Sequence, residues 1–165
     1  MEKFSIREVV EQAVQTEKLG YRFYTMMTER FKERDAEMAK LFTTLAEKEL
    51  RHEKIFAGLS EHIGDSEPEG WEEISQYMRA MVESEFFLGK GKSLPTMDGI
   101  KSVLDAVNFA IGFEKETLLY FYGLRDAVKE KGLVDEIIEE EKSHIRWLIC
   151  FKDAAGKSFC ACGCR

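Results

Sequence analysis

The 165-residue sequence contains only 2 prolines and 4 cysteines, and it has no long uninterrupted apolar run. The scarcity of proline permits long helices, because a proline inside a helix removes a backbone hydrogen bond. Three of the cysteines crowd into the last six residues, which excludes a disulfide framework for the fold. No apolar run reaches the roughly 18 residues that a membrane span requires, so we expect no membrane partner.

A surplus of basic residues is also missing. The net charge is -7 and the isoelectric point is near 5.2, which argues against a general basic surface and therefore against nucleic acid as a partner. The first residues, Met1 to Ser5, carry no signal-peptide pattern. We therefore expect a cytoplasmic protein.

Apolar residues recur with a helical period through most of the chain, and Glu, Lys, Leu and Ala are abundant. This pattern predicts an all-α protein with one buried domain over residues 1–155, an insertion at 64–97 and a flexible cysteine-containing tail at 156–165. Ser5 and Glu8 have the spacing of a capping box, and Asp35 is the expected N-cap of the second helix. The predicted helices cover about 6–31, 36–63, 71–87, 98–131 and 134–155, with a break at Gly132.

The stretch from Leu45 to Phe56 places polar residues where a helix should bury apolar ones. Continuing the apolar register in alternating steps of four and three leads to Glu49 and His52. These residues share one helix face, since positions i and i+3 are neighbours on a helix. A buried carboxylate beside a buried imidazole is costly unless a positive charge neutralises it, and a metal ion would do so.

The same interruption occurs in three other predicted helices. Glu17 and Glu114 each fall in an apolar stripe, and Glu141 with His144 repeats the Glu-x-x-His spacing. Each half of the chain is thus a helix with one core Glu followed by a helix with core Glu-x-x-His. The repeat predicts two helical hairpins around a pseudo-two-fold axis, forming a four-helix bundle with a short extra helix in the crossover.

Four carboxylates and two imidazoles in one bundle core make the ligand set of a di-iron or di-manganese carboxylate site. Their four negative charges balance two divalent cations. Oxygen and nitrogen donors favour iron, with manganese as the alternative, and the lack of core thiolates argues against structural zinc. We expect two Fe ions per chain, bridged by Glu49 and Glu141, with the remaining ligands Glu17, His52, Glu114 and His144.

Tyr24 lies seven residues after Glu17 on the same predicted face. It is a candidate for hydrogen-bonding a ligand or donating an electron, and packing is the alternative. The other acidic residues beside the ligands are expected on solvated faces; these are Glu47, Glu53, Glu139 and Glu140.

At these residues the sequence resembles the rubrerythrin-like branch of the ferritin-like di-iron carboxylate superfamily, over about residues 5–150. The resemblance implies the ferritin-like bundle, a non-haem di-iron centre with the six ligands named above, and redox chemistry with peroxide or dioxygen. Rubrerythrins often carry a rubredoxin domain with two Cys-x-x-Cys pairs for electron delivery, and this sequence has none. Their additional carboxylate, one turn after the third helix's ligand, falls at Thr117.

The expected function is an oxidoreductase of peroxidase or ferroxidase type, which reduces hydrogen peroxide or oxidises ferrous iron in oxidative-stress defence or iron handling, with an unidentified electron donor. The alternatives are a non-catalytic iron-storage protein and an inert helical interaction module. Trp71 and the pair Phe86-Phe87 are expected to be exposed and to favour a homodimer. The tail cysteines are either a soft-metal or dithiol site or part of a flexible tail; they are Cys160, Cys162 and Cys164.

Overall fold

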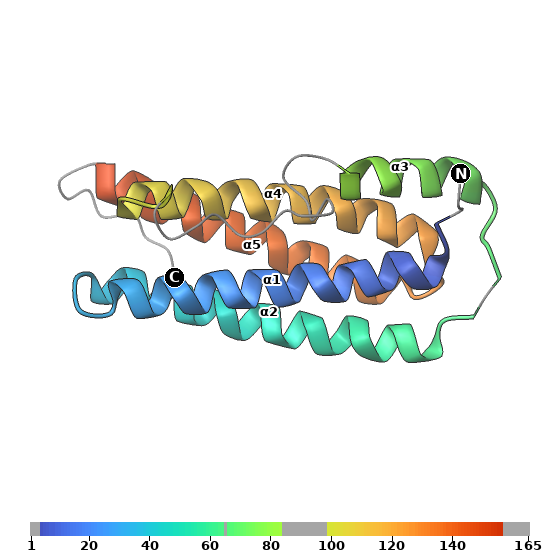
Figure 1. Cartoon of the computed structure of the whole chain (residues 1–165), viewed down its shortest axis with the longest axis horizontal. Helices are drawn as coiled ribbons and strands as arrows, with labels where there is room; N and C mark the ends of the chain where they lie inside the picture. Colours follow the sequence, from blue (N-terminus) through green and yellow to red (C-terminus); the bar gives the residue numbers. More distant parts are fainter. Residues whose placement is uncertain (1–3, 65, 84–98, 157–165) are drawn as a thin grey trace.

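The computed structural model describes residues 4–64, 66–83 and 99–156 of the chain. Within these ranges it contains helices and no strand, which confirms the all-α prediction. Four long helices run side by side, and a short helix lies at one end of the bundle (Figure 1). The elements are α1 (Ile6–Phe31), α2 (Ala36–His62), α3 (Trp71–Glu83), α4 (Val103–Ala127) and α5 (Lys131–Gly156).

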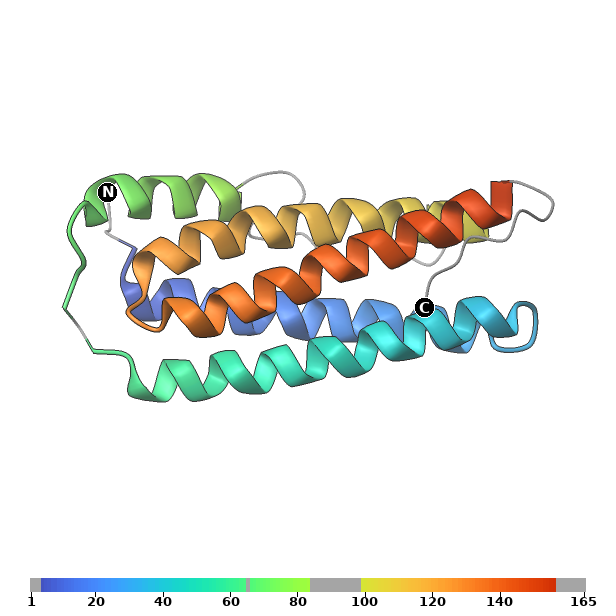
Figure 2. The same ribbon diagram turned by 180° about the vertical axis from the view of Figure 1, so that it is seen from behind.

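The bundle is built from two helical hairpins. Helices α1 and α2 pack along each other as the first hairpin, and α4 and α5 form the second (Figures 1 and 2). Helix α1 also packs against α4, while α3 lies on the outside of α4. This arrangement confirms the predicted four-helix bundle with an extra helix in the crossover.

Local capping sets the helix starts. Ser5 forms the predicted capping box with Glu8, and the Asp35 side chain accepts a hydrogen bond from the backbone N–H of Met38 at 3.0 Å.

The prediction of a helix over 98–131 was wrong at both ends. Ser102 caps α4 with a second capping box, and the extended backbone of Val128 (φ -108°, ψ 160°) ends it.

The predicted break at Gly132 was also wrong. Helix α5 begins at Lys131, so Gly132 lies in its first turn, where the N–H of Leu133 bonds to the carbonyl of Glu130 at 3.0 Å. A Cβ at Gly132 would meet no atom within 4 Å, so no close approach requires glycine there. The extended residue Val128 makes the turn between α4 and α5 instead.

The apolar core is divided into two parts. One part surrounds Phe56 and Phe121, and the other surrounds Phe23 and Phe42. The buried polar residues of each long helix fall between these two parts in the sequence. A polar layer therefore crosses the middle of an otherwise apolar bundle.

Helix α3 is fixed to α4 at Gly123. A Cβ on this glycine would lie 2.4 Å from Sδ of Met78 and 2.7 Å from Cε1 of Tyr77, so a larger residue there would force these side chains to shift. Trp71, at the start of α3, is only 5% exposed, which contradicts the expectation of an exposed tryptophan. Phe86 and Phe87 lie outside the described residues.

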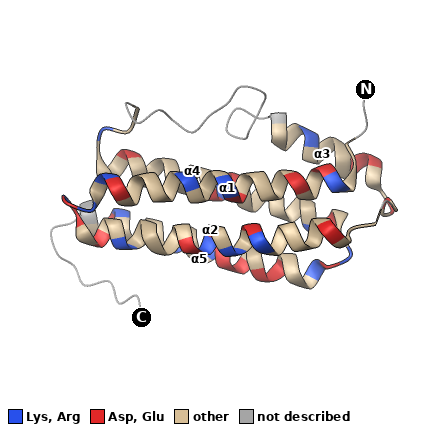
Figure 3. Cartoon of the chain, turned by 60° about the horizontal axis from the view of Figure 1, so that its bottom comes forward, with Lys and Arg blue, Asp and Glu red and all other residues tan. Residues whose placement is uncertain are grey.

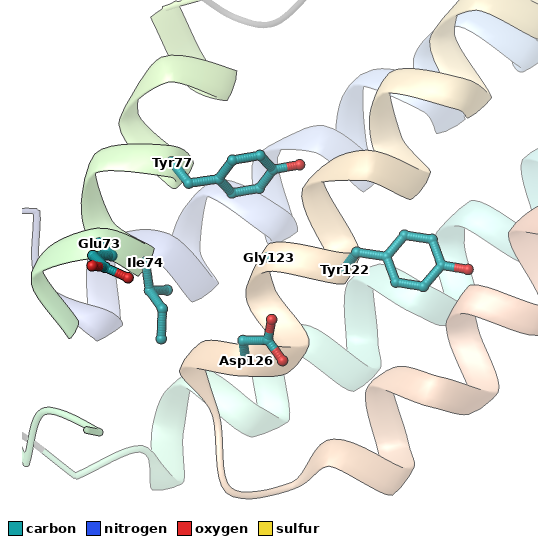
Figure 4. A pocket seen from close by; sticks show the side chains of 6 residues that line it. All are labelled: Glu73, Ile74, Tyr77, Tyr122, Gly123 and Asp126. Carbon is teal, nitrogen blue, oxygen red and sulfur yellow. The ribbon is translucent and has the colours of Figure 1, made fainter. Parts of the chain in front are cut away.

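A surface pocket of about 320 Å³ lies between α3 and α4, beside this contact (Figure 4). None of the predicted metal ligands lines it. Its lining residues are Glu73, Ile74, Tyr77, Tyr122, Gly123 and Asp126.

Acidic and basic residues are interspersed along the four long helices (Figure 3). Among the described residues, each helix is too short or too polar to cross a membrane.

Candidate metal centre

The six predicted ligands come together in the polar layer as two overlapping groups. Within each group, one ligand atom per residue lies within 4.8 Å of the others. Glu49 and Glu141 belong to both groups, and all six side chains are fully buried. That they bind metal remains a prediction. The groups are Glu17, Glu49, His52 and Glu141, and Glu49, Glu114, Glu141 and His144.

The Glu141 carboxylate lies between the two histidines. Its Oε2 is 2.9 Å from Nδ1 of His144, three residues further along α5, and its Oε1 is 2.8 Å from Nδ1 of His52 on α2. The two imidazole rings are stacked, with centroids 5.7 Å apart and an interplanar angle of 20°. Glu141 therefore presents one oxygen to each half of the site, the arrangement that its predicted bridging role requires.

These atoms lie within ion-pair distance of one another, but in a geometry that forms no hydrogen bond between them. Among the described residues, the carboxylate oxygens of Glu17, Glu49 and Glu141 and the Nδ1 atoms of both histidines have no hydrogen-bond partner. Buried polar atoms are almost always hydrogen-bonded, so such a group needs an explanation. Donor atoms that converge on a shared cation have this geometry. The residues therefore fit two divalent ions, each with oxygen and nitrogen ligands.

Three of the carboxyl groups hold protons tightly in this metal-free arrangement. Burial raises the pKa of Glu17 and Glu49 well above the usual carboxyl value, and neighbouring carboxylates raise it further. Burial and the charge of Glu141 raise the pKa of Glu114 to about 8. Glu141 differs: burial opposes ionisation, but the charge of His144 and contacts with both imidazoles hold its pKa well below the usual value.

The two histidines also hold protons. Burial alone would lower the pKa of His52, but its contact with Glu141 outweighs burial and raises the pKa to about 9. Burial is likewise outweighed at His144, where the charges of Glu141 and Glu114 raise the pKa well above the usual value. Without metal, protons thus take the place that cations would have among these six side chains. A metal ion must displace these protons in order to bind.

Tyr24 reaches across the bundle. Its buried hydroxyl donates a hydrogen bond to Oε1 of Glu114, so it contacts the ligand of the second hairpin rather than Glu17 of its own helix. Tyr24 therefore orients one predicted ligand.

Thr117, one turn after Glu114, is fully buried, and its hydroxyl has no hydrogen-bond partner among the described residues.

Glu140 was wrongly predicted to lie on a solvated face. Its side chain is only 25% exposed, and its Oε2 lies 3.3 Å from Nε2 of His52 and 3.0 Å from Nζ of Lys48. The sequence carried one signal for this contact. Lys48 and Glu140 each precede a bridging glutamate, so the two repeated halves carry opposite charges at matching positions. The prediction was also wrong for Glu53, whose side chain is only 22% exposed and lies 3.7 Å from Nζ of Lys18. By contrast, Glu47 and Glu139 are exposed as predicted.

Gly20 is a second residue whose role was missed. It faces the core one turn after Glu17, and a Cβ there would lie 2.5 Å from Oε2 of Glu49. The sequence indicates this role only by placing a glycine inside a segment whose other residues favour a helix. Cys150, on α5, is half-buried. Three cysteines considered from the sequence lie outside the described residues: Cys160, Cys162 and Cys164.

Comparison with known proteins supports the predicted family resemblance. The family model for rubrerythrin matches residues 8–87, which include Glu17, Glu49 and His52. A solved structure from Thermotoga maritima, described as a ferritin-like diiron-carboxylate protein, is 26% identical. The match covers 94% of this chain and 99% of that one, with a TM-score of 0.68. No curated protein matches the sequence. The family match and the shared fold confirm that the chain resembles the rubrerythrin-like branch of the ferritin-like superfamily and has the ferritin-like four-helix fold.

Proposed function

We propose that the chain is a di-iron oxidoreductase whose buried centre reacts with hydrogen peroxide or dioxygen, in peroxide reduction or ferrous iron oxidation. One observation carries this proposal: two overlapping groups of buried ligand atoms share Glu49 and Glu141 and lack hydrogen-bond partners among the described residues. The solved neighbour's description as a diiron-carboxylate protein supports it. The oxygen and nitrogen donors suit iron first and manganese second.

The residues divide naturally between two ions. Glu17 and His52 would hold one ion, Glu114 and His144 would hold the other, and Glu49 and Glu141 would bridge them. When bound, two irons would supply electrons to peroxide or dioxygen and cycle between ferrous and ferric states. The four carboxylates balance the charge of two divalent ions, so the loaded centre is neutral overall.

The surrounding residues control the environment of the centre. Phe56 and Phe121 on one side and Phe42 on the other are fully buried and keep bulk water from the polar layer. The hydroxyl of Tyr24 fixes one oxygen of Glu114, which leaves the second oxygen of this carboxylate for a cation. Electrostatic interactions are strong in so dry a layer.

The peroxidase form of the proposed chemistry needs electrons from outside the bundle. This sequence contains no Cys-x-x-Cys pair of the kind that rubredoxin domains use. We therefore propose a separate electron donor for the peroxidase reaction. The ferroxidase reaction requires none, since ferrous iron itself supplies the electrons.

The test is anaerobic loading with ferrous iron, followed by elemental analysis and by visible spectra before and after hydrogen peroxide. We expect about two irons per chain and a fast spectral change on peroxide addition. A chain that retains no iron would overturn the proposal. Glu47→Ala is the matched control for ligand variants, because Glu47 lies exposed on α2 beside the ligand layer.

A further inference from the structure

The outer nitrogen of His52 has a partner that lies outside the predicted ligand set. Glu140 precedes the bridging Glu141 on α5, yet its side chain turns towards α2. Its Oε2 lies 3.3 Å from Nε2 of His52 and 3.0 Å from Nζ of Lys48, while its Oε1 lies 3.0 Å from Nη1 of Arg51. Two basic side chains thus hold this carboxylate against the imidazole.

This contact determines which ring nitrogen of His52 faces the metal centre. Nδ1 lies 2.8 Å from Glu141 and 3.6 Å from Glu17, inside the ligand group. Nε2 points to Glu140 on the opposite side of the ring. An imidazole that binds a cation through one nitrogen carries a proton on the other. A carboxylate that accepts this N–H fixes the ring and makes the binding nitrogen a stronger donor.

Within the described part of the chain, His144 has no such support. Its Nδ1 lies 2.9 Å from Glu141, but its Nε2 is buried and has no hydrogen-bond partner among the described residues. The residue that matches Glu140 in the first half of the chain is Lys48, whose ammonium group cannot accept a hydrogen bond. The ring of Trp147 lies 5.6 Å from the His144 ring and offers only an N–H donor.

We infer that Glu140 is a positioning residue that makes the two metal positions unequal. The position held by Glu17 and His52 binds its ion more tightly and fills first, and the position held by Glu114 and His144 is the exchangeable one. This inference rests on the proposed metal centre and adds an order of filling to it. In a ferroxidase cycle, the exchangeable position is the one that ferrous iron enters and leaves.

The test is a titration of the metal-free full chain with Co²⁺, followed by visible absorption and calorimetry. The wild-type chain should bind two ions in two steps of different affinity. His52→Ala should remove the tighter step, and His144→Ala the weaker one. Glu140→Gln should weaken the tighter step by about 10- to 100-fold and leave the weaker step unchanged.

Two controls separate positioning from a general effect on charge or folding. Glu139→Gln removes the neighbouring carboxylate, which is exposed and paired with Lys142, and should change neither step. In the His52→Ala background, Glu140→Gln should have no effect, because the imidazole that it positions is gone. Circular dichroism of each variant checks that the helices are intact.

Two equal steps in the wild-type chain would overturn the inference, as would an equal loss of both steps in Glu140→Gln. Both results would leave the proposed function standing, because two ions would still bind. Failure of the wild-type chain to bind Co²⁺ or ferrous iron would instead overturn the proposed function, and this inference with it.

Discussion

Gly20 of α1 lies directly against the Glu49 carboxylate of α2. A Cβ atom on Gly20 would lie 2.5 Å from Oε2 of Glu49 and 3.0 Å from Cε1 of Phe113. The glycine is therefore required by the neighbouring ligand and not by its own backbone, which is helical. Any side chain at this position must displace a carboxylate that both ligand groups share.

Replacement of this glycine should separate metal binding from folding. We expect Gly20→Ala to lower the affinity for Co²⁺ by about 10-fold or more, because Glu49 must move away from its position. The fold should survive, since alanine favours the helix and the displaced atom is the end of a flexible side chain. Co²⁺ titration and thermal unfolding measure the two effects.

Gly58→Ala on α2 is the matched control. A Cβ there would meet no atom within 4 Å, so the variant should gain about 0.5–1 kcal/mol of stability and keep its metal affinity. Unchanged binding in Gly20→Ala would show that Glu49 is not held in a bridging position.

The shared ligands should be distinguishable from the terminal ones. Glu49→Ala removes an oxygen donor from both groups and should lower the occupancy of both ions, whereas Glu17→Ala should mainly weaken one. Elemental analysis after ferrous iron loading measures both outcomes. Glu47→Ala should retain full occupancy. Two irons in Glu49→Ala would refute the bridging assignment.

The metal-free fold should lose stability as the pH rises through neutrality. Folding raises the pKa of Glu114 from 4.5 to about 8 and that of His52 from 6.5 to about 9. Each group binds its proton more tightly when folded, so its stabilising contribution is complete below the unfolded pKa and is lost as pH rises through the folded pKa. We expect the Tm of chelator-treated protein to fall between pH 6.5 and 9.

Added metal should reverse this trend. Cations compete with those protons, so the rise in Tm on adding Co²⁺ should grow over the same pH range. A Tm of the metal-free chain that stays level or climbs across that range would contradict the proton-filled description of the empty centre. Glu114→Gln should make the Tm of the metal-free chain depend less on pH, since it removes one of the two groups whose pKa is raised by folding.

Tyr24 should contribute to stability through its hydroxyl. Tyr24→Phe leaves Oε1 of the buried Glu114 carboxyl group without its donor and should cost the metal-free chain about 1–3 kcal/mol. Denaturant unfolding measures this loss. Tyr21→Phe, at a ring that is 36% exposed, should change little. Equal effects of the two substitutions would rule out a specific role for the Tyr24 hydroxyl.

The oligomeric state is a further prediction. A homodimer should sediment with twice the chain mass of 19.1 kDa, whereas a storage cage would be far larger. Burial of Trp71 removes one of the aromatic residues from which self-association was predicted. Sedimentation as a monomer at tens of micromolar would contradict the dimer.

The ligand layer was predictable because burial and helical period are coupled. A helix face that is apolar at Leu45 and Phe56 must also bury Glu49 and His52, whatever the rest of the fold does. The same reasoning, applied to each helix, identified all six residues of the two groups. Periodicity gives the face of a helix even where its ends are misjudged.

The wrong predictions concern helix ends, which depend on local capping, and the burial of side chains that depends on contacts between helices. The start of α4 is set by hydrogen bonds of Ser102, which a continuous apolar pattern does not reveal. Glu140 looked like a surface residue because it lies beside the apolar stripe of its own helix. Only the approach of α2 brings His52 and Lys48 within reach of its carboxylate.

The ion pair between Lys48 and Glu140 bears on how such a bundle could arise by duplication. Two identical copies of one hairpin, related by a two-fold axis, would supply one core Glu and one Glu-x-x-His each, and so the whole ligand set. They would also carry the same residue at both of these matching positions, so a lysine could never face a glutamate there. Joining the two hairpins in one chain lets the halves diverge, and unequal metal positions become available only then.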